Sequence, residues 1–68
     1  MFFVRVPASS LLPGQVVGQV NTDRLRREYL SDQGKLAFVN TVNGTTILRY
    51  EDGSQAVVPG LTDYAVIG

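Results

Sequence analysis

The chain has 68 residues, of which 44% are hydrophobic, and its six basic and six acidic side chains give no net charge. It contains neither cysteine nor histidine, so disulfide bonds are excluded and a structural zinc site would need carboxylate ligands alone. This length suits one domain, residues 1–68, with a small core, because a domain of about 60 residues buries only about 60% of the surface that its unfolded chain exposes. We therefore expect a tightly packed core or a partner chain that covers apolar surface.

The first part of the sequence predicts two strands separated by a turn. Residues 2–6 alternate in the manner of a strand, and Pro7 ends it because proline cannot donate to a sheet. Pro13 and Gly14 suit the two central positions of a type II turn. A second strand is predicted at residues 15–20.

Residues 21–34 admit two interpretations. Asp23 resembles a helix N-cap, and Leu25 and Tyr29 have the i, i+4 spacing of a helix face. Leu25, Arg27 and Tyr29 alternate equally well as one face of a strand. We predict that residues 21–34 do not form a strand and are instead a long loop or a short helix.

The second half predicts a three-stranded meander followed by a closing strand. Asn43-Gly44 supports the positive φ angles of a type I′ turn, and residues 51–54 suit another tight turn. The strands of the meander are expected at residues 35–42, 45–50 and 55–58. A short break at residues 59–62 precedes the final strand at residues 63–67.

Five to six short antiparallel strands in so short a chain favour a barrel, because closure removes the exposed strand edges that invite aggregation. We predict a mostly β fold, a small Src-homology-3-like barrel that runs strand, long excursion, meander, tight break and closing strand. Alternation means that adjacent apolar residues cannot all point inward. The core is expected to come from Val16, Val17, Leu36, Phe38, Ile47, Leu48, Val57, Val58, Ala65 and Val66.

Two motifs carry a resemblance to a known family. Leu12-Pro13-Gly14-Gln15-Val16-Val17 is followed later by Tyr50-Glu51-Asp52-Gly53-Ser54. In these motifs, over about half of its length, the chain resembles small Src-homology-3-like β-barrel proteins of actinobacteria and their phages. The resemblance implies a small barrel and a phage or bacterial binding module, and it implies no particular partner. The strand at residues 2–6 and the charged stretch at 21–34 depart from the simplest version of the pattern.

The sequence contains no recognisable catalytic apparatus. Histidine and cysteine are absent, and most carboxylates lie in predicted turns or caps, where Asp bonds its own backbone. No glycine-rich phosphate loop precedes a helix. We therefore expect no enzymatic activity, no cofactor and no metal.

Arg24, Arg26 and Arg27 are the only concentration of charge in the sequence. They could contact an anion or a nucleic acid, since arginine offers phosphate a planar fork of donors. Alternatively they form a solvated face, which the acids interspersed among them favour. Tyr50 and Tyr64 are expected to pack in the core or rim. The predicted partner-binding residues are Leu25, Arg26, Arg27 and Tyr29.

Phe2 and Phe3 point to opposite faces of the predicted first strand, so only one ring can enter the core. The other is covered either by the excursion at 21–34 or by a partner chain. Phe2 and Phe3 are therefore candidates for an oligomer contact.

The predicted function is a non-catalytic protein-interaction module that binds another protein or a second copy of itself. The alternatives are a nucleic-acid-binding barrel, which the zero net charge disfavours, and a structural subunit of an oligomeric assembly such as a virion. No apolar run approaches the roughly 20 residues of a membrane helix. Without cysteine or an export signal, we expect a cytoplasmic protein of a bacterial or phage-infected cell, with a virion component as the alternative.

Overall fold

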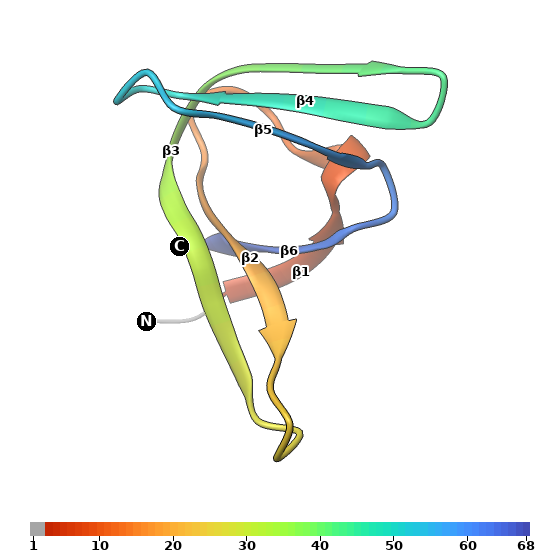
Figure 1. Cartoon of the computed structure of the whole chain (residues 1–68). Coiled ribbons are helices and arrows are strands. Elements are labelled where there is room, and N and C mark those ends of the chain that lie inside the picture. The colour runs from red at the N-terminus through yellow and green to blue at the C-terminus, as the bar shows by residue number, and fades with distance from the viewer. Residues whose placement is uncertain (1–2) are drawn as a thin grey trace.

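The computed structural model describes residues 3–68 and consists of one open β sheet with almost no helix (Figure 1). The described residues form six antiparallel strands and one turn of 3-10 helix, η1, at Ala8–Ser10. The strands are β1 Phe3–Pro7, β2 Val16–Thr22, β3 Glu28–Val42, β4 Thr45–Tyr50, β5 Gln55–Pro59 and β6 Asp63–Ile67. The mostly β class and the prediction of five to six antiparallel strands are confirmed.

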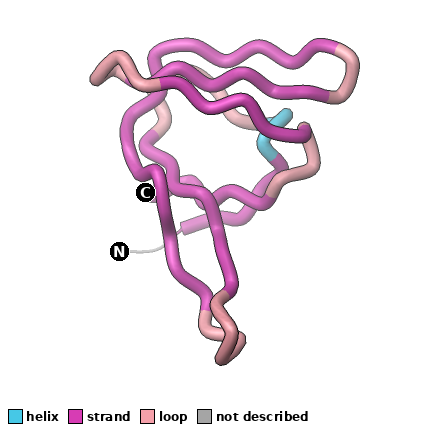
Figure 2. The backbone as a smooth tube through the Cα atoms, in the orientation of Figure 1, coloured by secondary structure: helices cyan, strands magenta, loops and turns pink. Residues whose placement is uncertain are grey.

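The strand order in the sheet is β1-β6-β2-β3-β4-β5. β3, β4 and β5 follow one another as the predicted meander, after which the chain returns so that β6 lies between β1 and β2. Among the described residues β1 and β5 do not pair with each other, so the sheet is open and the predicted closure into a barrel is not observed. Figure 2 shows that turns and short loops join the strands, except that η1 forms part of the connection from β1 to β2.

The long strand β3 belongs to both halves of the sheet. Its first part pairs with β2 and its second part pairs with β4. The register shifts at Val17/Gln19 in the first pairing and at Leu36/Phe38 in the second, and such bulges bend a strand and increase its twist. Figure 1 shows β3 curving between the hairpin that it forms with β2 and the meander.

The prediction of a helix or long loop at residues 21–34 is wrong. β2 continues to Thr22 and β3 begins at Glu28, so only residues 23–27 lie outside the strands, at the tip of a hairpin. The signal was ambiguous because an Asp at a helix N-cap and an Asp at the start of a turn accept the same kind of local N–H bond. Pairing with β2 decided the outcome, since an isolated helix of this length is marginal in water.

The core lies between the meander and the β1-β6-β2 half of the sheet. Of the predicted core residues, Val17, Leu36, Leu48 and Ala65 are fully buried, and Val58 and Val66 are partly buried against the core. Val16, Phe38 and Val57 are exposed on outer faces, as strand alternation requires. The packing interpretation of Tyr50 and Tyr64 is confirmed, because both rings belong to the core. The buried cluster comprises Ala8, Leu11, Val17, Leu36, Leu48, Tyr50 and Tyr64.

The two buried tyrosines predict a loss of stability at alkaline pH. The two buried hydroxyls lie near each other, but neither makes a hydrogen bond of normal geometry to a described residue. Burial is the main cause that raises the pKa of both Tyr50 and Tyr64 above the usual value of about 10. Above about pH 10 the unfolded chain therefore loses protons that the folded chain keeps, so the free energy of unfolding falls as pH rises. Below that pH both states are protonated and these groups contribute no pH dependence.

Urea unfolding between pH 7 and pH 11.5 measures this loss. We expect Tyr64→Phe to reduce the decline above pH 10, and to change stability at pH 7 by no more than about 1 kcal/mol, since the hydroxyl that it removes makes no hydrogen bond of normal geometry. An equally steep decline in Tyr64→Phe would show that another group causes it.

Candidate functional site

The hairpin tip, residues 23–27, is held in shape by its own first residue. Oδ1 of Asp23 accepts hydrogen bonds from the backbone N–H of Leu25 at 2.8 Å and of Arg27 at 2.9 Å. The backbone of Asp23 adds a bond to the carbonyl oxygen of Arg27 and accepts one from the N–H of Arg26, each at 3.0 Å. Arg26 takes a positive φ of 62°, the left-handed conformation that closes such a turn. The tip is therefore an ordered turn rather than a loose loop.

Arg27 contributes to this order, although its side chain is largely exposed. Its Nε lies 3.1 Å from Oδ2 of Asp23, so both oxygens of that carboxylate are used within the tip. The pKa of the Asp23 carboxyl lies below its usual range. The main cause is the hydrogen bond from the backbone N–H of Arg27, and the N–H of Leu25 and the Arg27 guanidinium add to it. Of the predicted contact residues, Arg27 thus has a structural partner in the turn itself.

The remaining side chains of the tip point outward. Leu25 is 71% exposed between Arg24 and Arg26, which are also exposed. Neither Arg24 nor Arg26 forms an ion pair with any residue in the described range 3–68. Figure 1 shows the tip projecting away from the rest of the sheet. Tyr29 is half exposed on β3, opposite Asn21, so it lies beside the tip and not on it.

Ion pairs from Arg5 of β1 fix the start of β3, next to the hairpin tip. Arg5 donates from Nη1 to Oε2 of Glu28 at 2.9 Å, and its other donors bind the carboxylate of Asp63 at the start of β6. A cavity of about 250 Å³ lies here, lined by Arg5, Val20, Glu28, Tyr29 and Leu30. Sequence reasoning missed these ion pairs because their three members come from three separate strands.

A second surface that sequence reasoning missed is the outer face of the meander. Phe38, Val42 and Val57 are about half exposed there, and cross-strand register places Val57 beside the partly buried Ile47. The guanidinium of Arg49 lies 5.7 Å from the centre of the Phe38 ring. We call Phe38, Val42, Ile47 and Val57 the meander face. The sequence does indicate this face, because its apolar residues alternate along the strands with the residues that are buried in the core.

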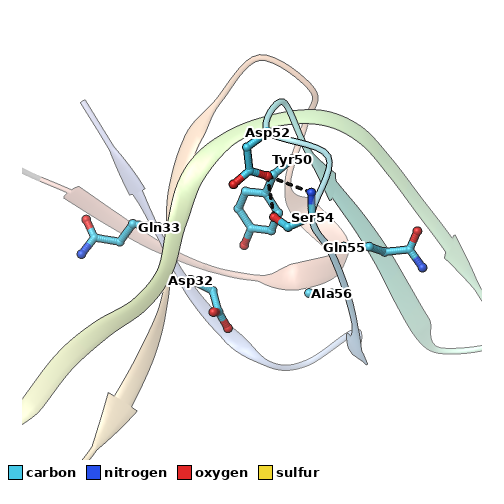
Figure 3. Close-up of a pocket in the computed structure, with 7 residues that line it drawn as sticks. All are labelled: Asp32, Gln33, Tyr50, Asp52, Ser54, Gln55 and Ala56. Carbon is cyan, nitrogen blue, oxygen red and sulfur yellow. Dashed lines mark hydrogen bonds between the residues drawn. The ribbon is translucent and has the colours of Figure 1, made fainter.

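A polar pocket of about 300 Å³ lies between the first bulge of β3 and the turn that joins β4 to β5 (Figure 3). In that turn Oδ1 of Asp52 accepts bonds from the N–H of Ser54 at 2.8 Å and from its Oγ at 2.6 Å. These bonds, the hydroxyl first, hold the pKa of the Asp52 carboxyl below its usual range. The pocket is lined by Asp32, Gln33, Tyr50, Asp52, Ser54, Gln55 and Ala56.

Replacing Asp23 tests whether the tip is ordered by this side chain. We expect the amide protons of Leu25 and Arg27 to exchange roughly tenfold faster in Asp23→Ala, because each loses its charge-assisted acceptor. The matched control is Asp52→Ala, which removes the equivalent acceptor from the other turn and should leave the tip unchanged. Hydrogen exchange followed by NMR measures both, and unchanged exchange at the tip in Asp23→Ala would contradict this account.

The remaining predicted residues lie at the start of the chain. Phe2 falls outside the described residues, as does the side chain of Phe3, which begins β1. No helix within residues 3–68 is long and apolar enough to cross a membrane. In the same range, no three carboxylates gather in a way that could hold a metal ion. Comparison with family models, with curated proteins and with solved structures finds no match for this chain.

Proposed function

We propose that this chain is a non-catalytic protein-interaction module whose contact surface is the hairpin tip. The observation that carries the proposal is the 71% exposed Leu25 between two arginines, on a turn that Asp23 holds in shape. An apolar side chain on an ordered turn loses little conformational freedom when it binds, so more of its burial contributes to affinity. Arginine is also enriched among the residues that dominate binding energy at protein interfaces.

The distribution of ion pairs supports the same surface. Arg5, Arg27 and Lys35 have carboxylate partners, at Lys35 with an Nζ to Oε2 distance of 3.9 Å from Glu51. Arg24 and Arg26 have none among the described residues, although the chain as a whole carries no net charge. Arg49 also lacks a carboxylate partner in this part of the chain, but its guanidinium lies against the Phe38 ring and Gln55. The partner that suits this tip has an apolar hollow for Leu25 with carboxylates on either side of it.

The fold proposal remains the Src-homology-3-like arrangement, and with it a phage or bacterial origin. It is supported by the order of the parts: a hairpin excursion, a meander, a break at residues 60–62, and a closing strand β6 that returns to β2. β1 is an addition to that plan, because it extends the sheet beyond β6. The proposed arrangement is an open one, since the strand order leaves β1 and β5 as edges.

Affinity capture with a matched pair of variants tests the proposed function. The tip variant combines Arg24→Gln, Leu25→Ser and Arg26→Gln, and it keeps Asp23 and Arg27 so that the turn still forms. We expect a protein that the wild type retains from a bacterial extract to be retained at least tenfold less by the tip variant. The control is Leu61→Ser, which removes an 89% exposed apolar side chain elsewhere on the surface.

Two results would contradict the proposal. One is an identical set of captured proteins for the wild type and the tip variant. The other is retention of DNA or RNA with a steep dependence on salt, which would favour the nucleic-acid alternative, because phosphate contacts release counterions.

The meander face favours a second candidate function, self-association. Both edge strands end in a proline, Pro7 and Pro59, which has no N–H to donate, so edge-to-edge pairing is restricted. The apolar meander face is the better route to a second copy. Light scattering at two concentrations would support this candidate if the wild type is an oligomer and the double variant Phe38→Ser, Val57→Ser is a monomer. A monomeric wild type would exclude it.

A further inference from the structure

The carboxylates of the chain fall into two groups. One group consists of acids that form an ion pair with an arginine or lysine of the same chain, and its members are Asp23, Glu28, Glu51 and Asp63. The other group has no cation within the described residues, and its members are Asp32 and Asp52. These two come from different strands or turns, yet both line the polar pocket beside the β4–β5 turn (Figure 3).

The lining of the same pocket includes Tyr50, which is 5% exposed. Its buried hydroxyl lies near the hydroxyl of Tyr64 and makes no hydrogen bond of normal geometry to any of the described residues. Burying such a group without a partner is costly, and most buried hydroxyls in proteins have one. Figure 3 shows Tyr50 in the middle of the pocket with Asp52 and Ser54 near one end of it and Asp32 near the other. A ligand that donates hydrogen bonds here would supply the missing partner.

The polar groups of the pocket suit a positively charged ligand that can donate several hydrogen bonds. Its lining includes two carboxylates and no basic residue. Oδ1 of Asp52 is used by Ser54, while no hydrogen bond within residues 3–68 uses Oδ2 of Asp52 or either oxygen of Asp32. A guanidinium group has five N–H donors in one plane and can serve two carboxylates and a phenol oxygen at once. A metal ion suits the site less well, because no third carboxylate joins these two in the described structure.

We propose that this pocket accepts the guanidinium group of an arginine, with Asp32 and Asp52 as its carboxylate partners and the hydroxyl of Tyr50 as a third acceptor. The volume of about 300 Å³ leaves room for one side chain. Asp32 sits in the bulge of β3 with a positive φ of 50°, which directs this residue out of the regular alternation of the strand. This site is separate from the hairpin tip, so it goes beyond the function proposed above and can fail independently of it.

Two sources could supply the arginine. One is another protein, and the other is the tip of a second copy, where Arg24 and Arg26 lack carboxylate partners among the described residues. The tip lies at the far end of the β2–β3 hairpin and the pocket lies beside the β4–β5 turn, so the two cannot meet within one molecule (Figure 1). Between molecules this contact would be head-to-tail, which generates a ring or a filament.

An NMR titration with two small probes tests the pocket directly. N-acetyl-arginine amide is compared with N-acetyl-citrulline amide, which has nearly the same shape but no charge. We expect saturable shift changes with the arginine probe at the backbone amides around Asp32 and Ser54, and at least tenfold weaker binding of the citrulline probe. Asp32→Asn and Asp52→Asn should each weaken binding of the arginine probe about fivefold or more. Asparagine tolerates the positive φ at position 32, so this variant should keep the bulge.

Glu51→Gln is the matched control, because it removes a neighbouring charge that pairs with Lys35 outside the pocket lining. Equal binding of both probes, or binding that Asp32→Asn and Asp52→Asn leave unchanged, would overturn the proposal. The same result would leave capture by the hairpin tip untouched, so the two proposals are distinguishable.

The mass of the protein in solution shows whether a second copy or another protein supplies the arginine. If light scattering gives the wild type a mass above that of one chain, and both Asp32→Asn and the double variant Arg24→Gln, Arg26→Gln return it to one chain, a second copy supplies the arginine. A wild type that has the mass of one chain at all concentrations and still binds the arginine probe assigns the arginine to another protein.

Discussion

Leu48→Ala is expected to remove a large part of the protein's stability at 25 °C. Leu48 has no exposed surface and lies at the centre of the meander, where its register neighbours are Val39 and Ala56. Truncating a fully buried leucine costs about 2–5 kcal/mol, because the removed methyl groups leave a cavity. A native chain of this length has a total stability of only roughly 3–10 kcal/mol. One substitution can therefore remove most of the stability.

Urea unfolding followed by circular dichroism measures this loss. The control is Val57→Ala on the adjacent strand β5, whose side chain is 59% exposed on the outer face and should cost less than about 1 kcal/mol. Equal losses in Leu48→Ala and Val57→Ala would mean that the inner and outer faces of the meander have been assigned wrongly.

The second large effect is expected at Gly34. A Cβ added there would lie 2.8 Å from Cδ2 of Tyr50, closer than packed carbon atoms approach, and the Tyr50 ring is buried and cannot move aside freely. We expect Gly34→Ala to destabilise the protein by about 1–3 kcal/mol, the usual cost of overpacking. Without the contact with Tyr50, Gly34→Ala would be expected to stabilise the protein, since alanine in a strand is favoured over glycine by roughly 0.5–1 kcal/mol.

A double-mutant cycle with Tyr50→Leu tests the cause. If the Tyr50 ring is responsible, the cost of Gly34→Ala should shrink by at least about 1 kcal/mol in the Tyr50→Leu background, because contacting residues are not additive. Stabilisation by Gly34→Ala in the wild type, or an unchanged cost in the double variant, would contradict the packing described for this glycine.

The turns of the meander were predictable because their chemistry is local. Asn43 and Gly44 have positive φ angles of 52° and 77°, as a type I′ turn requires, and Gly14 has the positive φ of 91° expected after Pro13 in a type II turn. Each conformation depends on residues next to one another in the chain, so the sequence contains enough information to predict it.

The β2–β3 hairpin and the open sheet were not predictable in this way. Asp23 accepts N–H bonds in the observed turn as it would at a helix N-cap, so the local signal is the same for both structures. The choice depended on pairing with β2, which is a tertiary interaction. Whether six strands close into a barrel depends in turn on how far β3 bends at its bulges, and no residue pattern specifies that curvature.

The candidate site was predictable only in part. The exposed Leu25 and Arg26 follow from a charged stretch that the barrel does not need, whereas the ion pair of Arg27 with Asp23 depends on the geometry of the turn. The polar pocket could not be foreseen, because Asp32 and Asp52 are brought together by a bulge in one strand and a turn between two others.

Photocrosslinking in cells tests whether the hairpin tip contacts the partner. A photoreactive phenylalanine derivative is placed either at position 25 or at position 61, both of which hold exposed leucines and so control for non-specific adhesion. We expect one discrete crosslinked protein from position 25, and we expect that protein to be absent from the products of position 61. Crosslinking of the same protein from position 61 and not from position 25 would contradict the claim and move the contact surface away from the hairpin.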